Sequence, residues 1–404
     1  MRTGIHCSWR APRRQTIRKI YALKNTILIV LKVGFAGLLI WFVLSQIETR
    51  DRLQVPVSSE VATHESIYGE YQGDWRAEQW AFTADDGAEY SGSHSDQYIL
   101  QPGFATAMRS LDIRWYLLAV ALWGGLLVFA AQRWRILLHA AGVPVSYRDS
   151  FRLTIIGYFF NNVLLGSTGG DLVRAVMVSR TVEQNRMRAA ISVIVDRLIG
   201  LFALMLIAGT VLSIFWYDNR ISEVPGLRLV MSAVYLLLFI AIVGSAIYLS
   251  RRARKRMGVD WVLSKLPAQD LIQKLDDAIT LYRDHKRTVL GALLISLPLQ
   301  LCGILSFWAI GVALGSSLSL MEDFVIFPVV QTVSALPLAP AGWGVGETLF
   351  GTFFRSFGSS FTLGVAVSVL FRLTSQVGYG LIGGFIWATS KERRQGISMQ
   401  DKKS

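Results

Sequence analysis

Cysteine, histidine and charged residues are all scarce in this chain of 404 residues. Two cysteines, Cys7 and Cys302, give no basis for a disulfide framework or a cysteine-based metal site. The five histidines are scattered without the spacing of metal ligands. Charged residues make up 17% of the chain and hydrophobic residues 52%, which favours a membrane protein and predicts neither a metal site nor a bound cofactor.

Long apolar runs are what the sequence has instead. A helix needs ~20 apolar residues to cross a hydrocarbon core of ~30 Å. Runs of this length lie at residues 26–47, 113–131, 189–217, 226–250, 289–315 and 361–388. The first follows basic residues, as a secretory signal does, but it is too long and lacks a small-x-small cleavage site, so we expect an uncleaved anchor. The sequence thus predicts an all-α polytopic membrane protein with about six spanning helices.

The positions of arginine and lysine predict the orientation through the positive-inside rule. The N-terminal segment 1–25 is basic and the segment 48–112 is acidic, which places the first in the cytoplasm and the second outside. The block 251–256 and the tail 391–404 are basic, so we expect both to be cytoplasmic. These positions suit a bacterial inner-membrane protein with cytoplasmic termini. The net charge of +13 lies beside the spans, where anionic lipid favours it, so we expect no nucleic-acid partner.

Two further apolar stretches are predicted to enter and leave the membrane on the same side. Residues 151–165 are flanked on both sides by arginines that belong on the cytoplasmic face, and a re-entrant hairpin satisfies both flanks. Residues 324–357 begin and end outside by the same reasoning. The halves 113–217 and 289–388 then follow the order span, hairpin, span with opposite orientation, which predicts an inverted repeat. Between them, 251–288 is predicted to hold an amphipathic surface helix or an ordinary helix packed under the bundle.

Each predicted hairpin contains a glycine-rich cassette that closes with glycine and a carboxylate. The first runs from Gly166 to Asp171 and the second from Gly342 to Glu347. Glycine-broken backbone is tolerated at membrane depth where it lines a polar cavity, and its amides can accept an anion. Alternatively, the carboxylates are only helix caps and Arg174 is only a cytoplasmic anchor. The candidate lipid-binding residues of the cassettes are Asn161, Asn162, Gly166, Gly169, Gly170, Asp171, Arg174, Pro340, Gly342, Gly344, Gly346 and Glu347.

Three charged residues inside predicted spans complete the candidate site. Asp196 and Arg197 are adjacent on a helix and point about 100° apart, so each needs a partner from another element. Structural pairing near the cytoplasmic interface is the alternative. Arg372 lies about 16 Å deep, too far for snorkelling, and Glu347 or Asp171 is its expected partner.

The external segment 48–112 shows no helical or strand period. It mixes glycine, serine and acidic residues with tyrosines and tryptophans. The aromatic side chains would suit docking on the bilayer or recognition of a sugar. We expect partial disorder held by local packing.

These motifs resemble the transmembrane-domain family of lysylphosphatidylglycerol synthase, the flippase-like region of the multiple peptide resistance factor. The resemblance covers about 113–390 and is carried by Asn161-x4-Gly166-Ser-Thr-Gly-Gly-Asp171-x2-Arg174-Ala, Asp196-Arg197-Leu-x-Gly, Pro340-x-Gly-x-Gly-x-Gly-Glu347 and Phe371-Arg372-Leu. It implies translocation of an anionic or modified phospholipid between leaflets. We expect no aminoacylation, because the sequence leaves no room for the soluble aminoacyl-transfer domain of the full synthase.

Two other classes of function stay open. A membrane-embedded transferase acting on a lipid phosphate could use Asp171, Asp196 and Glu347 as acid, base or metal ligands. The sequence has no Asp-x-Asp pair, His-x4-Asp pair or P-loop to support it. An envelope scaffold could recruit a partner through 48–112. Membrane lipids are the expected partners in the favoured interpretation, and both a homo-oligomer and an envelope partner are compatible with it.

Overall fold

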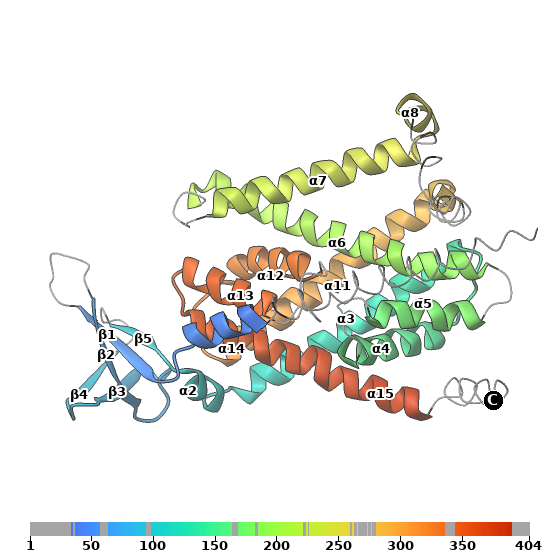
Figure 1. Cartoon of the computed structure of the whole chain (residues 1–404). Helices are drawn as coiled ribbons and strands as arrows, with labels where there is room; N and C mark the ends of the chain where they lie inside the picture. Colours follow the sequence, from blue (N-terminus) through green and yellow to red (C-terminus); the bar gives the residue numbers. More distant parts are fainter. Residues whose placement is uncertain are drawn as a thin grey trace, which may run out of the picture.

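The structure, a computed structural model, consists of a helical bundle with a small sheet at one end (Figure 1). It describes residues 34, 37–56, 64–93, 98–163, 169–181, 185–220, 224, 226–258, 261, 265, 273, 276, 280–335 and 344–389. The elements of the bundle are α3 (Ile113–Ala140), α4 (Tyr147–Val163), α5 (Gly169–Thr181), α6 (Arg186–Tyr217), α7 (Leu227–Leu249), α8 (Arg251–Arg256), α11 (Lys286–Ala313), α12 (Leu320–Ser334), α13 (Val345–Ser356), α14 (Phe361–Arg372), the π-helical η3 (Leu373–Gly378) and α15 (Tyr379–Thr389).

Five helices are long and apolar enough to span a membrane within the described part of the chain. They are Ile113–Ala140, Arg186–Tyr217, Leu227–Tyr248, Lys286–Ala313 and Phe361–Thr389. These match five of the six predicted spans. Most of the sixth, 26–47, lies outside the described residues, and its described part contains the short apolar helix Gly37–Gln46.

The centre of the bundle is an antiparallel pair of helices, α3 and α11. The backbone N–H of Asp112, the cap of α3, donates to the carbonyl of Ala313, the last residue of α11, at 2.9 Å. About two turns further along the pair, the Ser306 hydroxyl donates to the Ala119 carbonyl at 2.8 Å. Phe307 of α11 packs its ring on aromatic residues of α12, α13 and α14, so this pair carries the largest hydrophobic cluster of the bundle.

Two helical hairpins pack around this central pair. Helices α4, α5, α12 and α13 contain 17, 13, 15 and 12 residues, or about 25, 20, 22 and 18 Å at 1.5 Å per residue. Each leg is therefore shorter than a hydrocarbon core of ~30 Å. Figure 1 shows α12 and α13 at the end of the bundle near the sheet, and α4 and α5 toward the opposite end.

Each hairpin packs on the last helix of the other half of the chain. Helix α4 contacts α15, and α12 contacts α6. The first of these crossings is close, because a Cβ at Gly383 of α15 would collide with the carbonyl oxygen of Ile155 of α4. The two halves of the sequence are therefore interleaved in one bundle.

The described residues between 48 and 112 include a five-stranded β-sheet, so the expected absence of a strand period is wrong and the all-α fold class is incomplete. The strands are β1 (Asp51–Pro56), β2 (His64–Tyr71), β3 (Gln79–Ala84), β4 (Glu89–Ser93) and β5 (Ile99–Gln101). All neighbours are antiparallel in the order β4-β3-β2-β1-β5. The short helix α2 (Phe104–Arg109) leads from the sheet to α3.

The sheet has a short but regular hydrophobic pattern. On β3 the buried residues Trp80, Phe82 and Ala84 alternate with more exposed ones. The turn to β4 contains Asp86 and Gly87, and the glycine has a φ of 85°, which its missing Cβ allows. Alternation over six residues followed by Asp-Gly is a hairpin signal, and the acidic, glycine-rich composition around it hid that signal.

The sheet is attached to the bundle where α3 begins and α11 ends. The Trp75 indole N–H donates to the Ser110 hydroxyl at 3.0 Å, and Arg76 Nη1 donates to the Ala313 carbonyl at 3.0 Å. A Cβ on Gly315, which follows α11, would collide with the Trp75 ring, so the loop between β2 and β3 lies directly on the bundle.

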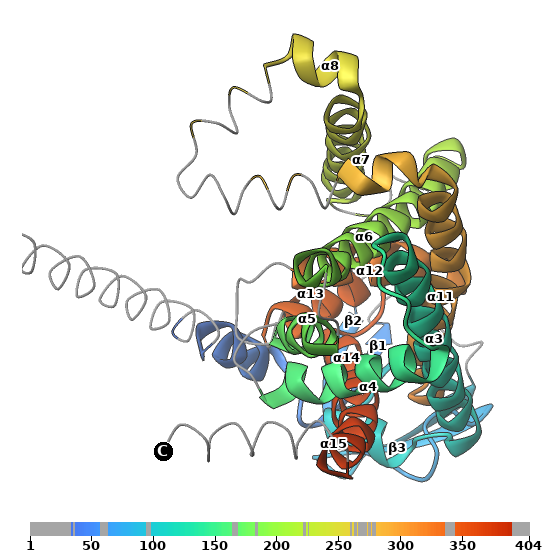
Figure 2. The same ribbon diagram turned by 90° about the vertical axis from the view of Figure 1, so that its right-hand side faces the viewer.

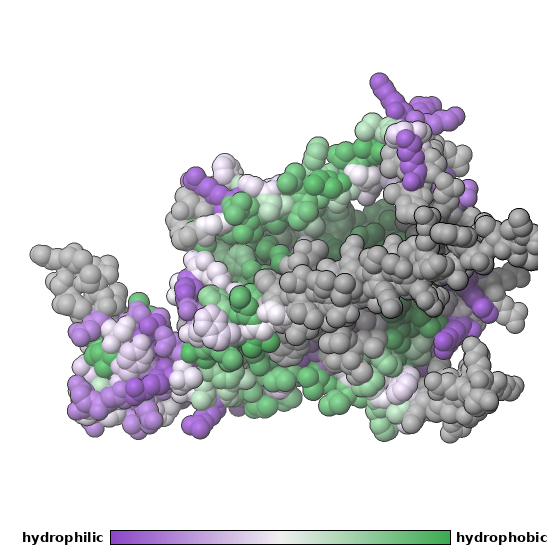
Figure 3. All heavy atoms as spheres, viewed as in Figure 1, coloured by the Kyte–Doolittle hydropathy of each residue, from purple (hydrophilic) through white to green (hydrophobic). Residues whose placement is uncertain are grey.

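The surface separates into a hydrophobic band and hydrophilic ends. Figure 3 shows the sheet at one end and α8 at the other as hydrophilic, with apolar residues between them. Helix α7 packs on α6 and stands at the edge of the bundle (Figures 1 and 2). Its residues Leu229, Leu236 and Phe239 are more than half exposed, as expected for a helix that faces lipid.

Candidate functional site

Asp196 on α6 forms a buried ion pair with an arginine from another helix. Its Oδ1 atom lies 2.8 Å from Nε of Arg133 on α3. Arg133 is 7% exposed and Asp196 is 5% exposed. Arg133 also donates from Nη1 to the Ser296 hydroxyl of α11 at 3.0 Å. The interaction therefore connects three helices, and it confirms that Asp196 needs a partner from a different element.

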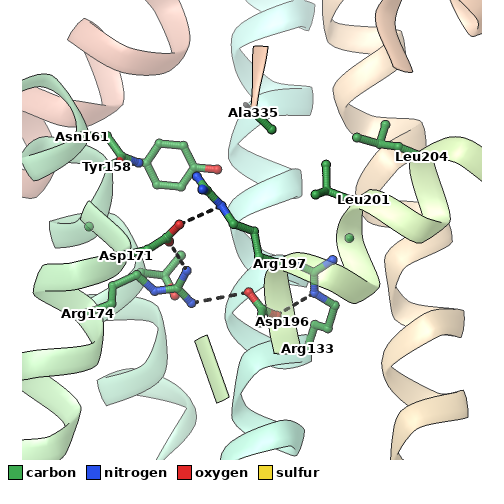
Figure 4. Close-up of a pocket in the computed structure, with 13 residues that line it drawn as sticks. Arg133, Tyr158, Asn161, Asp171, Arg174, Asp196, Arg197, Leu201, Leu204 and Ala335 are labelled. Carbon is green, nitrogen blue, oxygen red and sulfur yellow. Dashed lines mark hydrogen bonds and ion pairs between the residues drawn. The ribbon is translucent and has the colours of Figure 1, made fainter. Parts of the chain in front are cut away.

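A second carboxylate, Asp171 at the start of α5, pairs with the neighbouring Arg197 of α6. Arg197 Nε lies 2.8 Å from Asp171 Oδ2. Arg174 lies between the two carboxylates, with Nη1 3.5 Å from Asp171 Oδ1 and Nη2 3.7 Å from Asp196 Oδ2 (Figure 4). Three guanidinium groups and two carboxylates thus form one continuous cluster.

A cavity of about 220 Å³ opens beside this cluster (Figure 4). The three arginines and two aspartates of the cluster all line it, so their formal charges sum to +1 (three minus two). At this net charge the cavity favours an anion, and its lining also offers amide and hydroxyl groups. The lining residues are Arg133, Thr154, Gly157, Tyr158, Asn161, Asp171, Arg174, Asp196, Arg197, Gly200, Leu201, Leu204 and Ala335.

Arg174 is held in place by packing, and its guanidinium is only partly hydrogen-bonded within the described part of the chain. The guanidinium carbon lies 4.1 Å from the centre of the fully buried Trp134 ring, a cation–π contact. Its stem packs against Gly157, where a Cβ would meet Cδ of Arg174 at 2.6 Å. Nε and Nη2 are buried and make no hydrogen bond to another described residue. These donors are available to an anion in the cavity.

The described part of the first cassette closes the α4–α5 hairpin. The Asn161 side-chain oxygen accepts from the N–H of Gly170 at 2.8 Å. A Cβ on Gly170 would collide with the carbonyl of Gly157, so this glycine is required for the helix crossing. Gly169 is the first residue of α5, Asn162 is part of α4, and Gly166 lies outside the described residues.

The second cassette forms the start of α13 and a buried ion pair. Gly344, with a φ of 82°, caps α13, and its N–H donates to Glu347 Oε2 at 2.8 Å. Glu347 Oε1 lies 2.6 Å from Nε of Arg372, and the two side chains are 5% and 7% exposed. Glu347 is therefore both a helix cap and the expected partner of Arg372. Pro340 and Gly342 lie outside the described residues.

The two cassettes make the same pairing. Asp171 and Glu347 each follow the last glycine of a cassette, and each binds an arginine of the following span, Arg197 or Arg372. Glu347 and Arg372 do not line the 220 Å³ cavity. They lie close to the end of α12. A Cβ on Gly346, next to Glu347, would lie 3.5 Å from the hydroxyl of Ser334, the last residue of α12. Ala335, which follows Ser334, lines the cavity.

Arg133 is the charged residue of the cavity that the sequence does not predict. The predicted second span ends at residue 131, which leaves Arg133 in the basic segment that follows it. Helix α3 continues to Ala140 because the residues after Arg135 are again apolar. The sequence does contain a signal that Arg133 lies inside the span: apolar residues continue for about one and a half helical turns after Arg135.

Metal binding has no candidate among the residues that the structure describes. These residues contain no group of three or more histidine, cysteine, aspartate or glutamate side chains placed to hold an ion. The chemistry that the cavity offers is that of paired guanidinium and carboxylate groups.

Comparison with known proteins identifies the family. Residues 102–383 match the family model described as the lysylphosphatidylglycerol synthase TM region. The chain belongs to this family. The match covers all the residues of the cavity and of the Glu347–Arg372 pair, and it starts just after the strands of the sheet.

Archaeal membrane proteins are among the relatives. The chain is 26% identical over 298 residues to the UPF0104 membrane protein PH1989 of Pyrococcus horikoshii, an alignment that covers 69% of this chain and 88% of the relative. It is 23% identical to a UPF0104 membrane protein of Methanothermobacter thermautotrophicus, over 69% of this chain and 86% of that one. This likeness supports a stand-alone multi-pass membrane protein.

Proposed function

We propose that this protein moves an anionic or modified phospholipid between the two leaflets of the membrane. The observation that carries the proposal is the 220 Å³ cavity, whose charged side chains sum to +1. Asp196 lies ten residues from the start of α6, or about 15 Å from the helix end. Charged residues at such depth are costly and typically mark a substrate pathway. A phosphate headgroup supplies a negative charge for the net +1 of the cavity and acceptors for Nε and Nη2 of Arg174.

We also propose that the two halves are inverted repeats whose hairpins are re-entrant. The antiparallel α3 and α11 would be equivalent, as would the hairpins α4–α5 and α12–α13. Helix α4 packs on α15 as α12 packs on α6, and α5 packs on α6 as α13 packs on α14. The equivalent pairs Asp171–Arg197 and Glu347–Arg372 support the same relation. Such a repeat supports alternating access to a central site from the two sides.

The proposed orientation places the sheet outside the cell and both termini in a bacterial cytoplasm. The cavity then lies in the cytoplasmic half of the bundle and the Glu347–Arg372 pair in the outer half. When a headgroup binds, its phosphate would replace aspartate carboxylates as the partner of the arginines that line the cavity. The arginine charges would thus stay compensated while the lipid moves.

The direct test uses the purified protein in vesicles that contain a fluorescent phosphatidylglycerol, quenched from outside. Arg174→Gln removes the guanidinium whose Nε and Nη2 make no hydrogen bond to another described residue. We expect lipid movement to slow about tenfold or more, because a hydrogen bond to a charged group contributes ~1.5–3 kcal/mol. Arg180→Gln is the matched control, since Arg180 lies on the same helix and is exposed.

Each outcome of this assay decides between the alternatives. If lipid movement is lost in Arg174→Gln and normal in Arg180→Gln, the result supports the cavity as the headgroup site. Equal rates in the two variants would exclude it. If the wild-type protein moves no lipid of any headgroup tried, the translocator proposal fails, and a transferase or a scaffold becomes the better hypothesis.

A further inference from the structure

Asp323, in the first turn of α12, is a buried carboxyl group that takes no part in the cavity or in the ion pairs described above. The residue is 2% exposed, and its Oδ1 atom is buried without a hydrogen-bond donor among the described residues. An ionised carboxylate in such surroundings is very costly, whereas a protonated one is not. The position therefore favours a neutral carboxylic acid.

The first half of the chain has a serine, Ser150, at the position in α4 that corresponds to Asp323 in α12. Ser146 directly precedes α4, and its hydroxyl donates to Asp149 at 2.6 Å. Ser319 directly precedes α12 in the same way, and its N–H donates to Glu322 at 2.7 Å. Ser150 follows Asp149 in α4, as Asp323 follows Glu322 in α12.

Ser150 is fully buried, and its hydroxyl donates to the Ala131 carbonyl of α3 at 2.8 Å. Asp323 occupies the corresponding place in α12, which packs on α11, the helix that corresponds to α3. A carboxylic acid can donate a hydrogen bond as serine does, but a carboxylate can only accept one. The comparison gives a second reason for a proton on Asp323.

The charges around Asp323 do not neutralise a carboxylate there. On its own helix Glu322 is adjacent and negative, and it is engaged by Arg220, which follows α6, at 2.8 Å. On α13, Arg355 bonds Gln46 and lies over the Phe361 ring. The outer half of α11 carries no charged side chain, and Asp218 at the end of α6 is exposed.

Helix α12 is also built to shift at this end. Pro328 lies inside it, and because proline has no N–H, the carbonyl of Phe324 loses its intrahelical donor. The turn that carries Asp323 is therefore less firmly joined to the rest of the helix. The other end of α12 leads to Ala335, in the wall of the charged cavity.

We propose that Asp323 is a proton-binding site that couples proton movement to the motion of α12. The proton is taken up by the carboxylate when this turn is exposed to water, and the neutral acid then packs into the bundle. Release of the proton restores a carboxylate, which favours the hydrated position of the turn. The coupling part of this proposal rests on the proposed lipid translocation, whereas the proton site itself does not.

The proton site can be tested without any transport. Infrared difference spectra of the full-length protein in vesicles, recorded while pH is raised from neutral, report the C=O stretch of protonated carboxyl groups. At neutral pH we expect the C=O band of a protonated carboxyl group in the wild type and in the control Asp218→Asn. This band should be absent in Asp323→Asn. The same band in wild type and Asp323→Asn would overturn the proposal.

Coupling is tested by lipid movement under a pH gradient, with the membrane potential held at zero. One proton per lipid predicts that a gradient of one pH unit changes the leaflet ratio about tenfold at steady state. Asp323→Ser, which copies Ser150, should still move lipid but with a ratio independent of the gradient, and Asp323→Glu should restore part of the response. A gradient response that survives in Asp323→Ser would exclude coupling through this residue.

The two proposals fail in different ways. If wild-type protein moves lipid at a leaflet ratio that ignores the gradient, lipid translocation stands and coupling through Asp323 is wrong. If wild-type protein moves no lipid but the infrared band depends on Asp323, the proton site stands and phospholipid is the wrong cargo.

Discussion

The Nε atom of Arg372 lies 2.6 Å from Oε1 of Glu347, and both side chains are buried inside the bundle. This pair joins the start of α13 to the last turn of α14. Glu347 simultaneously accepts the N–H of Gly344, so one carboxylate caps a helix and neutralises an arginine. In the first half, Asp171 likewise forms an ion pair with Arg197, and there the pair lines a cavity.

Removing one partner of the Arg372–Glu347 pair should destabilise the protein more than removing both. Arg372→Met leaves Glu347 as an uncompensated buried charge, at a cost of about 3–5 kcal/mol. In Arg372→Met with Glu347→Gln the buried charges are gone, so we expect part of the lost stability to return. The melting temperature of the detergent-solubilised protein, followed by size-exclusion chromatography after heating, measures both effects. The exposed Arg180→Gln is the control, and a double variant less stable than either single one would contradict the prediction.

Asp196 should be the most sensitive residue of the charged cluster. It compensates Arg133 directly and lies within ion-pair distance of Arg174, so Asp196→Asn leaves two guanidinium groups with reduced compensation. We expect a lower melting temperature than for Arg174→Gln, which leaves Asp196 paired with Arg133. Adding Arg133→Gln to Asp196→Asn should recover stability, because the two residues are in contact and their effects are coupled. Additive losses from the two changes would show that the pair contributes nothing beyond its separate residues.

Gly170 and Gly346 should respond differently to a side chain. A Cβ at Gly170 would meet the backbone carbonyl of Gly157, which cannot move without separating α4 from α5. At Gly346 the obstacle is the end of the Arg372 side chain, which is flexible. Gly170→Ala should therefore lower the yield of folded protein severely, whereas Gly346→Ala should leave a folded protein with a weakened ion pair. Equal yields of monodisperse protein would mean that the α4–α5 crossing tolerates a wider separation.

The long helices were predictable from the sequence, because bilayer thickness fixes how many apolar residues a span needs. The need of Asp196 and Arg372 for partners was equally predictable from the cost of buried charge. The particular partner Arg133 was not, since its pairing depends on how far α3 continues past an arginine and on how α3 crosses α6. Distances between helices that are far apart in sequence are set by packing, which no local pattern records.

The sheet shows the opposite case. Its sequence contains a local hairpin signal, but the composition of the whole segment favoured disorder. Strand β3 alternates buried and more exposed residues, and Asp86-Gly87 marks its turn. Composition favoured disorder because it averages over the whole segment, whereas strand pairing needs only five or six suitable residues at a time. The contact between Trp75 and the outer end of the bundle adds a tertiary contribution that the sequence of the segment cannot reveal.

The proposed re-entrant hairpins make a prediction about sidedness that does not depend on transport. If α4 and α5 enter and leave from the cytoplasm, Arg186 at the start of α6 lies on the same side as Arg148 at the start of α4. If the hairpin instead crosses the membrane, the two positions lie on opposite sides. In a background with Cys7→Ser and Cys302→Ser, we introduce Arg148→Cys or Arg186→Cys and treat intact cells with an impermeant maleimide.

Both cytoplasmic cysteines should resist labelling in intact cells and react after the cells are opened. Glu89→Cys on the exposed strand β4 is the positive control and should react in intact cells. Reaction of Arg186→Cys from outside, with Arg148→Cys protected, would show that one leg of the α4–α5 hairpin crosses fully. The inverted repeat would then be untenable, because its order of span, hairpin, span requires both ends of the hairpin on one side of the membrane.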